Sequence, residues 1–366
     1  MRILNILSGG LAGGAALASL QMHHDFIDMG HESALFLTRF NFLTFQKNAK
    51  DQSLKATLRA KISSYLSRVL VQDGSRKYSF PIRFGNQVKK LVGFDLVIIH
   101  FNGDGGINMK ELEFLSRNNE NIVILLRDFR FLTAGCHYPI GCNEFINSCS
   151  HCPYSQYAFD SFFDKSFINI IARLKIRVCS LSPLGDWSKQ FPFPISSIGN
   201  VVDVNKFCSE INFKTKNGAI VGSINPADAY KGSSRLVELR RKLNSDLLIF
   251  GGEAVDGSLG ILSQCQIKDE LLKRKYFIVP SVQESFNKLV CEAILCGVIP
   301  IVFAGSIGPE HIVRSCGFGF VVDSIDEVVA IIDSDEGDYE NLENAISFIS
   351  ENFTTAKLLE GIFRLL

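Results

Sequence analysis

The stretch VPSVQESFNKLVCEAILCGVIPIVFAGSIGPEHI, residues 279–312, contains the pattern that decides the fold. An apolar run, YFIVPS at 276–281, leads into a polar loop and then into a helical pattern that begins near Lys288. A second apolar run, IPIVFA at 299–304, follows that helix. Short buried strands that alternate with helices predict a parallel sheet with helices on both faces.

The same stretch places two carboxylates eight positions apart. Glu284 lies in the loop, and Glu292 lies about one turn into the helix at about 1.5 Å per residue. Ligands bind beside the carboxyl edge of such sheets, so we expect both carboxylates to face one crevice. The amides of Asn287, Lys288 and Leu289 would hold a phosphate there. Carboxylates beside a phosphate suit ribose and sugar hydroxyls, so the pattern indicates a nucleoside diphosphate sugar.

The composition excludes several classes of protein. A chain of 366 residues is too long for one ordinary core, so two domains are expected. A formal net charge of zero argues against a nucleic-acid partner. No run of apolar residues is long enough to span a membrane, and glycines interrupt the apolar N-terminus where a signal peptide would be continuous. We therefore predict a cytoplasmic protein whose ten cysteines are thiols or metal ligands.

Further strand patterns extend the α/β alternation along the chain. They lie at 2–7, 33–38, 95–100, 121–126 and 175–182 in the first half, and at 218–223, 247–252 and 319–323 in the second. Two such sets predict two doubly wound Rossmann-like domains that face a cleft. The expected division is an N-terminal acceptor-side domain at 1–184, a proline-containing linker at 185–205, a donor-binding domain at 206–345, and a closing helix at about 346–366 that returns to the first domain.

A basic segment at 52–90 has two interpretations. Apolar residues recur there at helical spacing from Leu54 to Leu70, with Lys and Arg between them. An amphipathic cationic helix can rest on anionic lipid at the inner face of the cell membrane. The alternative is a helix whose apolar stripe packs on the protein's own core and whose basic face is solvated.

A cysteine cluster at 127–154 predicts a structural zinc site. Its members are Cys136, Cys142, Cys149 and Cys152, of which the last two form a C-x2-C pair. Four thiolates at this spacing suit tetrahedral zinc and leave no open position for a catalytic water. Two disulfides or four ordinary thiols are the alternatives.

Residues 276–323 resemble the retaining, nucleotide-sugar-dependent glycosyltransferases of the GT-B fold, family 4, which carry an E-x7-E motif. The resemblance implies that Glu284 contacts the donor sugar and that Glu292 binds the ribose. It also implies that the intervening loop holds the pyrophosphate. That loop comprises Ser285, Phe286, Asn287, Lys288 and Leu289.

Other segments resemble the same family. Gly13 and Gly14 lie in its opening glycine loop, where the backbone approaches the donor phosphates. Lys231 lies where a lysine neutralises the leaving diphosphate, and Ser223 lies where the family usually has Arg. Either one cationic partner is missing or Arg235 supplies it.

The cysteine block resembles the colanic-acid, surface-polysaccharide branch of the family. Asp128 is retained there and is implied to be catalytic. Arg127 and Arg130 replace the branch's His and Trp, and that His lies near the donor sugar. His100 resembles a strand-end histidine of the family, although a routine buried histidine is an equal alternative.

The resemblance implies sugar transfer with retention of anomeric configuration. The acceptor would be a saccharide or a lipid-linked sugar in bacterial polysaccharide biosynthesis. No catalytic metal is expected, because Lys231 and backbone amides would stabilise the diphosphate. The alternatives are an epimerase or phosphorylase of the same architecture and a catalytically impaired nucleotide-sugar-binding subunit, which Arg127 and Ser223 favour.

Overall fold

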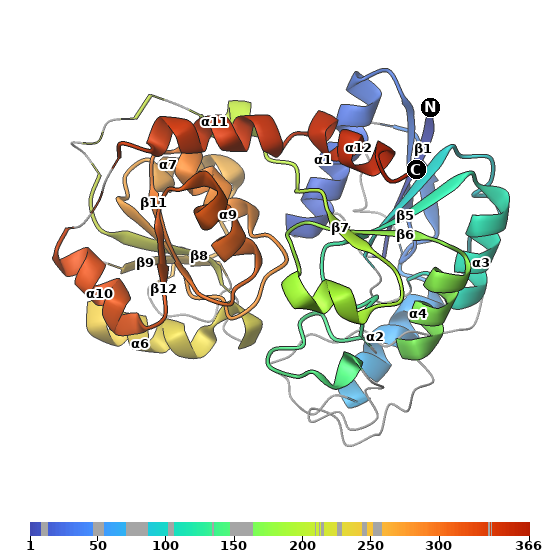
Figure 1. The fold of residues 1–366 in the computed structure, drawn as a ribbon, viewed down its shortest axis with the longest axis horizontal. Helices are drawn as coiled ribbons and strands as arrows, with labels where there is room; N and C mark the ends of the chain where they lie inside the picture. The colour runs from blue at the N-terminus through green and yellow to red at the C-terminus, as the bar shows by residue number, and fades with distance from the viewer. Residues whose placement is uncertain are drawn as a thin grey trace. The chain divides into compact units, whose positions relative to one another are not determined.

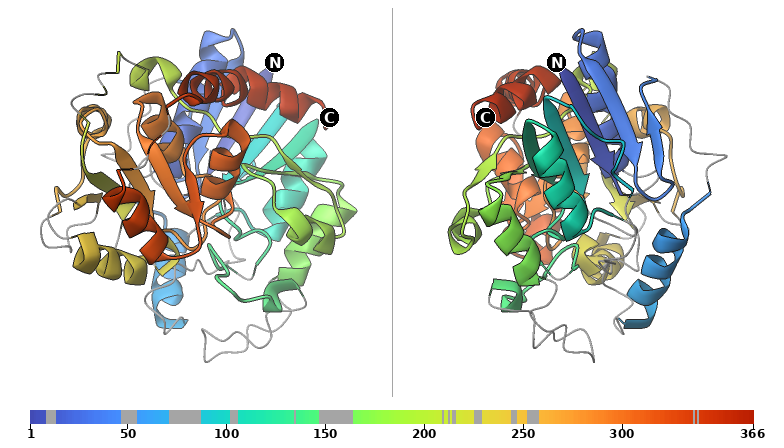
Figure 2. Two further views of the ribbon diagram at one scale, coloured as in Figure 1. Left: turned by 60° about the vertical axis from the view of Figure 1, so that its left-hand side comes forward. Right: turned by 90° about the vertical axis from the view of Figure 1, so that its right-hand side faces the viewer.

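The computed structural model describes most of the chain and divides it into two compact units. The described residues are 1–8, 14–46, 55–70, 87–101, 106–133, 135–146, 164–208, 210–211, 213, 216–224, 229–243, 247–251, 258–335, 337 and 339–366. Unit 1 comprises Met1–Val201 and Thr355–Leu366, and unit 2 comprises Val202–Thr354. Figure 1 shows the helices and strands of each unit, and Figure 2 gives two further views.

Unit 1 is built on a seven-stranded sheet in the order β3-β2-β1-β4-β5-β6-β7. Neighbouring strands are parallel, except that β3 runs antiparallel to β2. The strands are β1 (Arg2–Leu7), β2 (Glu32–Leu37), β3 (Phe42–Thr44), β4 (Leu96–Phe101), β5 (Asn121–Leu126), β6 (Arg177–Ser180) and β7 (Ile195–Ser197). The helices are α1 (Gly14–Asp28), α2 (Leu58–Leu70), α3 (Met109–Asn118), α4 (Asp164–Arg173) and α12 (Thr355–Phe363), with 3-10 turns η1 (Glu144–Ile146) and η2 (Gly185–Gln190).

Unit 2 is built on a five-stranded parallel sheet in the order β12-β11-β10-β8-β9. The strands are β8 (Ala219–Ile224), β9 (Leu247–Gly251), β10 (Tyr276–Val279), β11 (Ile299–Phe303) and β12 (Phe320–Val322). The helices are α5 (Val204–Phe207), η4 (Ala229–Lys231), α6 (Ser233–Leu243), α7 (Gln264–Leu271), α8 (Lys288–Leu295), α9 (Gly308–Cys316), α10 (Ile325–Asp333) and α11 (Leu342–Asn352).

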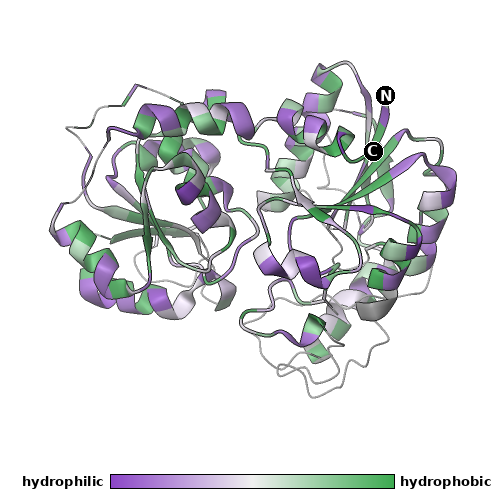
Figure 3. Ribbon diagram, viewed as in Figure 1, coloured by the Kyte–Doolittle hydropathy of each residue, from purple (hydrophilic) through white to green (hydrophobic). Residues whose placement is uncertain are grey.

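The central strands form the cores of both units. Ile3, Leu4 and Ile6 of β1 have no exposed surface, and neither do Ile278 of β10 and Ile301 of β11. Figure 3 shows this as apolar colour along both sheets, while the helices are mixed. Burying each such side chain contributes roughly 1.5–3 kcal/mol, so the sheet interiors are the main source of stability.

The strand order locates a binding crevice in unit 2. The chain starts at β8 and adds β9 on one side but β10 on the other, so the order reverses between β8 and β10. Ligands of open α/β sheets bind at the carboxyl ends of the strands at this switch point. The loop after β10 carries Glu284, so the predicted site residue lies at the expected edge.

The predicted fold class is confirmed as two Rossmann-like α/β units. Every strand predicted from the sequence is present, whereas β3 and β7, which have three residues each, were not predicted. The stretch expected to be a linker, 185–205, contains η2 and edge strand β7, which pairs with β6. The closing segment contains two helices, of which α11 belongs to unit 2 and α12 to unit 1. Among the described residues, no helix combines the length and the hydropathy needed to cross a membrane.

The apolar side chains of α2 are divided between its packed and its exposed sides. Its buried residues are Arg59, Ala60 and Ser63, and its exposed residues include Leu58 and Tyr65, with 72% and 66% of their surfaces accessible. Of the expected apolar stripe, Ile62 and Leu66 are half-buried whereas Leu58 and Val69 are exposed, so the described part of the stripe packs on the core only in part. Leu54 and the segment 71–86 lie outside the described residues.

Candidate active site

The carboxylate of Glu284 is the centre of a hydrogen-bonded cluster in unit 2. Only 6% of this residue is exposed. Its Oε1 accepts hydrogen bonds from Lys231 Nζ at 2.8 Å, Ser281 Oγ at 2.6 Å and Asn287 Nδ2 at 3.2 Å. These three bonds converge on one oxygen, so a ligand hydroxyl would meet the other, Oε2.

Lys231 is held against Glu284 by the packing of η4 on the loop after β10. The carbonyl of Tyr230 accepts a hydrogen bond from the amide of Val282 at 2.8 Å. Gly232 follows with φ +75, and a Cβ there would lie 1.9 Å from the Pro280 carbonyl oxygen. Only glycine permits this approach, so Gly232 sets the distance between the lysine and the carboxylate.

The ion pair between Lys231 and Glu284 is largely enclosed, with side-chain exposures of 17% and 8%. Such a pair recovers its desolvation cost only if further hydrogen bonds satisfy the charged groups. Ser281 and Asn287 supply two of them to Glu284. The pair is therefore well formed without a ligand, and a ligand would have to replace its contacts with equivalent ones.

The backbone next to Glu284 adopts unfavourable conformations. Ile307 has φ 64 and ψ −88, which is a genuine outlier for a β-branched residue. Its neighbours tie two loops together, because Glu284 N donates to Ser306 O at 3.0 Å and Gly308 N donates to Glu284 O at 2.9 Å. A Cβ on Gly308 would lie 2.3 Å from Phe286 Cα. Strain of this kind concentrates at ligand sites, where the surrounding structure maintains it.

The start of α8 is suited to an anion. Asn287 is the N-cap residue in the left-handed region, with φ 66, and its side chain makes no capping hydrogen bond. Instead that side chain donates to Glu284. The first amides of α8 therefore lack a side-chain cap from Asn287 and carry the positive end of the helix dipole.

Glu292 lies one turn further along α8. Its Oε1 is 3.5 Å from Lys288 Nζ, and Lys206 and Asp203 are also close enough to affect its charge. Burial raises the pKa of Glu292, and Lys288 and Lys206 oppose this shift without overcoming it. A hydroxyl that donates to this carboxylate would favour its ionised form.

Arg235 does not occupy the role of a second phosphate-binding cation. Its Nη1 donates to the carbonyls of Pro280 and Ser281 at 3.2 and 3.1 Å, and its guanidinium lies 4.0 Å from the ring centroid of Phe303. Arg235 thus supports the loop that carries Glu284. The side chain of Ser223 and the residues of the glycine loop up to Gly13 lie outside the described part of the structure.

The sequence did not single out several residues of this cluster. Ser281 lies in the Pro-Ser pair that was noted only as context, yet it makes the shortest hydrogen bond of the three to Glu284. Gly232 and Gly308 carry no side chain, and their close contacts depend on loops that meet only in the folded chain. The one signal in the sequence was that Gly232 directly follows Lys231, which was already a candidate site residue.

The predicted site residues of unit 1 are engaged in internal contacts. Both oxygens of Asp128 accept from Arg130, whose Nε lies 3.0 Å from Oδ1 and 2.8 Å from Oδ2. Gly14 begins α1, and a Cβ there would meet none of the described atoms within 4 Å.

Arg127 is buried at the end of β5 and stays cationic. Its Nε donates to His100 Nδ1 at 3.2 Å, its Nη1 to Asn200 Oδ1 at 3.0 Å, and its Nη2 to Met22 Sδ at 3.1 Å. Burial lowers the pKa of Arg127 to about 9. Burial and the adjacent guanidinium hold the pKa of His100 well below its usual value, so this imidazole is neutral.

A buried chain of hydrogen bonds continues from His100 through unit 1. Because His100 Nδ1 accepts, its Nε2 donates to Asn5 Oδ1 at 3.0 Å. Asn5 Nδ2 donates to Ser33 Oγ at 3.1 Å, and Ser33 Oγ lies 2.8 Å from His23 Nδ1. His23 Nε2 donates to Gln46 O at 3.1 Å. We call the hydrogen-bonded residues Arg127, His100, Asn5, Ser33, His23 and Gln46 the relay. In each of its hydrogen bonds the donated hydrogen points away from the Arg127 guanidinium, so the aligned bonds stabilise that positive charge.

The four predicted zinc ligands are only partly described. Cys136 and Cys142 are half-buried, whereas Cys149 and Cys152 lie outside the described residues. Within the described ranges, no three His, Cys, Asp or Glu side chains gather as a metal site would require. The zinc site therefore stays a prediction.

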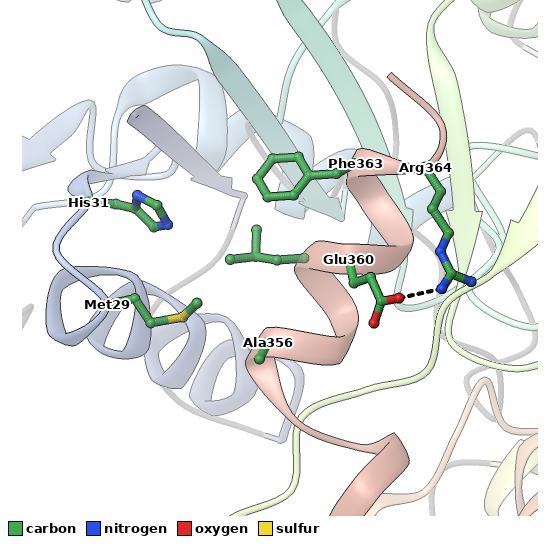
Figure 4. A pocket seen from close by; sticks show the side chains of 7 residues that line it. Met29, His31, Ala356, Glu360, Phe363 and Arg364 are labelled. Carbon is green, nitrogen blue, oxygen red and sulfur yellow. Dashed lines mark hydrogen bonds and ion pairs between the residues drawn. The ribbon is translucent and has the colours of Figure 1, made fainter.

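A separate groove of about 440 Å³ lies on unit 1 between the end of α1 and α12 (Figure 4). Its walls are mostly apolar, and Glu360 pairs with Arg364 at one side. The groove is lined by Met29, His31, Ala356, Leu359, Glu360, Phe363 and Arg364. It contains none of the residues that the sequence assigns to the donor site.

Comparison with known proteins establishes the fold. No family model matches the chain, and no curated protein matches it. Among solved structures, sucrose-phosphate synthase from Thermosynechococcus elongatus aligns with a TM-score of 0.65 at 13% identity, over 99% of this chain and 98% of the other. HepE from Anabaena, in complex with UDP-glucose, aligns with a TM-score of 0.59 at 15% identity, over 100% and 98%.

WaaG, a glycosyltransferase involved in lipopolysaccharide biosynthesis, aligns with a TM-score of 0.61 at 12% identity, over 99% of each chain. Each alignment extends over almost the full length of both proteins. The chain therefore has the two-domain GT-B architecture of these enzymes. At such low identities the likeness concerns the fold.

Proposed function

We propose that the protein is a glycosyltransferase that moves a sugar from a nucleoside diphosphate sugar to an acceptor hydroxyl, with the donor bound by unit 2. The observation that carries this proposal is the arrangement around Glu284. A cation, a carboxylate and the start of α8 lie together at the switch point of the sheet. Fold likeness to HepE, a protein solved with UDP-glucose, supports the same donor class.

The arrangement suggests how the chain's own residues act on a donor. The bond between the anomeric carbon of the sugar and the diphosphate oxygen breaks as the acceptor hydroxyl oxygen bonds to that carbon. Negative charge grows on the leaving diphosphate, which takes up the hydroxyl proton. Lys231 and the first amides of α8 would stabilise that charge, because both are fixed before the reaction begins. Lys231 would exchange Glu284 for the phosphate, while Glu284 would accept a hydrogen bond from a sugar hydroxyl.

The finer assignments come from the sequence resemblance. They are retention of configuration, Glu292 as the ribose acceptor, a loop from Ser285 to Leu289 on the pyrophosphate, and a catalytic role for Asp128. The acceptor is proposed to be a saccharide or a lipid-linked sugar of a bacterial surface polysaccharide, handled at the cytoplasmic side of the membrane. Catalysis is proposed to need no metal, and zinc would serve only to order the cysteine segment.

A donor screen tests the proposal. UDP-, GDP-, ADP- and dTDP-sugars are added to the protein, and the midpoint of thermal unfolding is measured. A ligand at 100 times its Kd adds about 2.7 kcal/mol to the stability, which is readily detected. One nucleotide class should raise the midpoint and should release its nucleoside diphosphate when an acceptor is supplied. No shift with any nucleotide sugar would contradict the proposal.

A catalytically impaired binding subunit is the second candidate. The observation in its favour is that Arg127 and Asp128, at the positions of the branch's His and catalytic Asp, both contact other residues of unit 1. This candidate predicts donor binding without release of nucleoside diphosphate on any acceptor tested. Turnover on one acceptor would exclude it.

A further inference from the structure

We propose that aromatic side chains at the carboxyl edge of the sheet of unit 1 bind the pyranose ring of a neutral saccharide. The site, called here the ring platform, comprises Trp187 and Phe191 with Asp186 and Lys189 beside them. All four residues lie on η2 or directly after it, in the segment that follows strand β6. The inference rests on the proposed function only in naming this saccharide as the acceptor, because its binding is tested without a donor.

The two rings of the platform pack on two buried phenylalanines. The ring centroid of Trp187 lies 5.5 Å from that of Phe129 and 5.3 Å from that of Phe145, both in an edge-to-face arrangement. Phe191 stacks on Phe145 at 6.5 Å, with an angle of 22° between the ring planes. Phe129 and Phe145 are 1% and 2% exposed. Trp187 and Phe191 are only half-buried, so the buried rings hold them in place while part of each stays accessible.

These aromatic contacts join two segments that start at the same edge of the sheet. Phe129 and Phe145 lie in the segment after β5, and Trp187 lies in the segment after β6. The strands β5 and β6 are parallel neighbours, so both segments leave the sheet at its carboxyl edge. Ligands of open α/β sheets bind beside that edge. The ring platform therefore lies where the fold of unit 1 offers a ligand site.

A pair of opposite charges flanks Trp187 in the turn. Lys189 Nζ donates to Asp186 Oδ1 at 2.7 Å, and these two side chains are 79% and 86% exposed. A carboxylate accepts hydrogen bonds from hydroxyls, and an ammonium group donates to them. An exposed ion pair of this kind contributes little to stability, so exchanging it for hydroxyl contacts costs little. The pair can therefore bind the hydroxyls at the rim of a sugar ring.

The chemistry of the platform fits a neutral pyranose better than a nucleotide. The face of a pyranose carries C–H groups with a partial positive charge, which are attracted to the negative face of an aromatic ring. Ligand sites combine such aromatic walls with a few polar groups that fix the orientation of the ligand. The charges of Asp186 and Lys189 cancel, so these two side chains together do not attract a phosphate. A neutral saccharide is therefore the favoured ligand.

The fluorescence of Trp187 tests the platform directly, because this residue is the only tryptophan of the chain. The full-length protein is titrated, without a donor, with methyl β-D-glucopyranoside, methyl β-D-galactopyranoside and cellobiose. We expect a saturable change in the emission with at least one of them, since a sugar ring that covers the indole displaces water from it. Sorbitol is the control ligand, because it has the hydroxyls of a sugar without the ring, and it should leave the emission unchanged.

Two variants and a matched control locate the binding site. Asp186→Ala/Lys189→Ala should raise the Kd of the responding glycoside about tenfold, because the charged partners of its hydroxyls are lost. Phe191→Leu keeps an apolar side chain but removes the ring, so it should raise the Kd about fivefold. The control Lys357→Ala/Glu360→Ala removes an exposed ion pair of the same spacing on α12, and it should leave the Kd unchanged. Circular dichroism checks that each variant is folded.

Several results would overturn the inference. They are an unchanged emission in all three glycoside titrations, an equal response to sorbitol, and an unchanged Kd in Asp186→Ala/Lys189→Ala. A larger response to uridine monophosphate than to any glycoside would assign the platform to a nucleotide instead. A saturable glycoside response in a protein that releases no nucleoside diphosphate from any donor would support the platform and contradict only the proposed function.

Discussion

Each unit buries a charged side chain near the carboxyl edge of its sheet, and the two charges are satisfied in different ways. In unit 2, Glu284 meets a cation, Lys231, beside a strained turn at Ile307. In unit 1, Arg127 heads a chain of neutral groups that begins at His100 and crosses the sheet.

The difference separates a charge that can exchange partners from one that supports the fold. A bound donor would offer Lys231 a diphosphate in place of Glu284, and it would offer Glu284 a sugar hydroxyl in place of Lys231. The relay offers no such exchange, because every member from Arg127 to Gln46 already donates or accepts within unit 1.

Loss of the exchangeable pair should have the largest effect. Lys231→Ala or Glu284→Ala should lower the turnover number for sugar transfer by about 10²–10³-fold, because a preorganised charged contact to the transition state is lost. The turnover number is measured as nucleoside diphosphate released at saturating donor.

Lys242→Ala is the matched control for the lysine. This lysine lies on α6 and pairs at the surface with Asp326. Its loss should leave the turnover number unchanged, whereas equal losses in both lysine variants would show that the Lys231 effect is general.

Breaking the relay should destabilise unit 1 without weakening donor binding. Asn5→Ala removes the acceptor of His100 and the donor to Ser33, which should lower the free energy of unfolding by about 2–4 kcal/mol. The chain's single tryptophan, Trp187, lies in unit 1, so its fluorescence in urea reports the unfolding of this unit.

Asn118→Ala provides the comparison, since its side chain makes an exposed hydrogen bond to Phe114 O. It should change the free energy of unfolding by less than about 0.5 kcal/mol. A normal urea midpoint for Asn5→Ala would show that the relay contributes little.

A larger side chain at Gly308, where the loop after β11 touches the loop after β10, should moderately weaken the binding of the donor. Gly308→Ala places a methyl group against the Phe286 backbone, so the loop with Glu284 must shift. We expect the Kd for the nucleotide sugar to rise about tenfold, which is about 1.4 kcal/mol.

Gly305→Ala is the partner experiment, because a Cβ at Gly305 meets no atom within 4 Å. Its positive φ costs stability but leaves the loop contact intact. Similar Kd values for the two variants would contradict the importance of the contact.

Acid should weaken donor binding through Glu292 by a few fold. Its pKa is raised by burial, so its carboxylate protonates at a higher pH than an ordinary glutamate and then no longer accepts two hydroxyls. The same shift makes its contribution to folding stability greatest at low pH and lost as the pH rises through the raised pKa. The Kd of a nucleotide sugar is measured by calorimetry at a series of pH values from neutral to acidic, and it should rise as the pH falls.

Glu292→Gln should bind the nucleotide sugar more weakly at neutral pH and lose this pH dependence. The pyrophosphate of the ligand stays ionised throughout, so it does not mask the effect. Parallel curves for the wild type and the variant would remove Glu292 from the ribose site.

The sequence predicted the parts of the fold that depend on local pattern. Apolar runs such as 276–281 are strands, and the loop with Glu284 follows at the expected sheet edge. The sequence did not predict contacts between distant loops, such as Gly232 against Pro280 and Gly308 against Phe286. These contacts arise only when two loops that follow different strands meet in the folded chain.

The orientation of α2 illustrates a second limit. Helical spacing of Leu58 and Val69 shows that they share a face, but it does not show which way that face points. The direction is set by Arg59, whose partner Glu111 lies 52 positions away. Partners that distant leave no signal in the spacing of one helix.

The most direct test of the donor site is a crystal structure with the nucleotide sugar that the screen identifies. We expect the diphosphate on the amides of Asn287–Leu289 and on Lys231 Nζ, a ribose hydroxyl on Glu292, and the sugar on Glu284 Oε2. A nucleotide bound away from the start of α8, with the pair between Lys231 and Glu284 still closed, would contradict it.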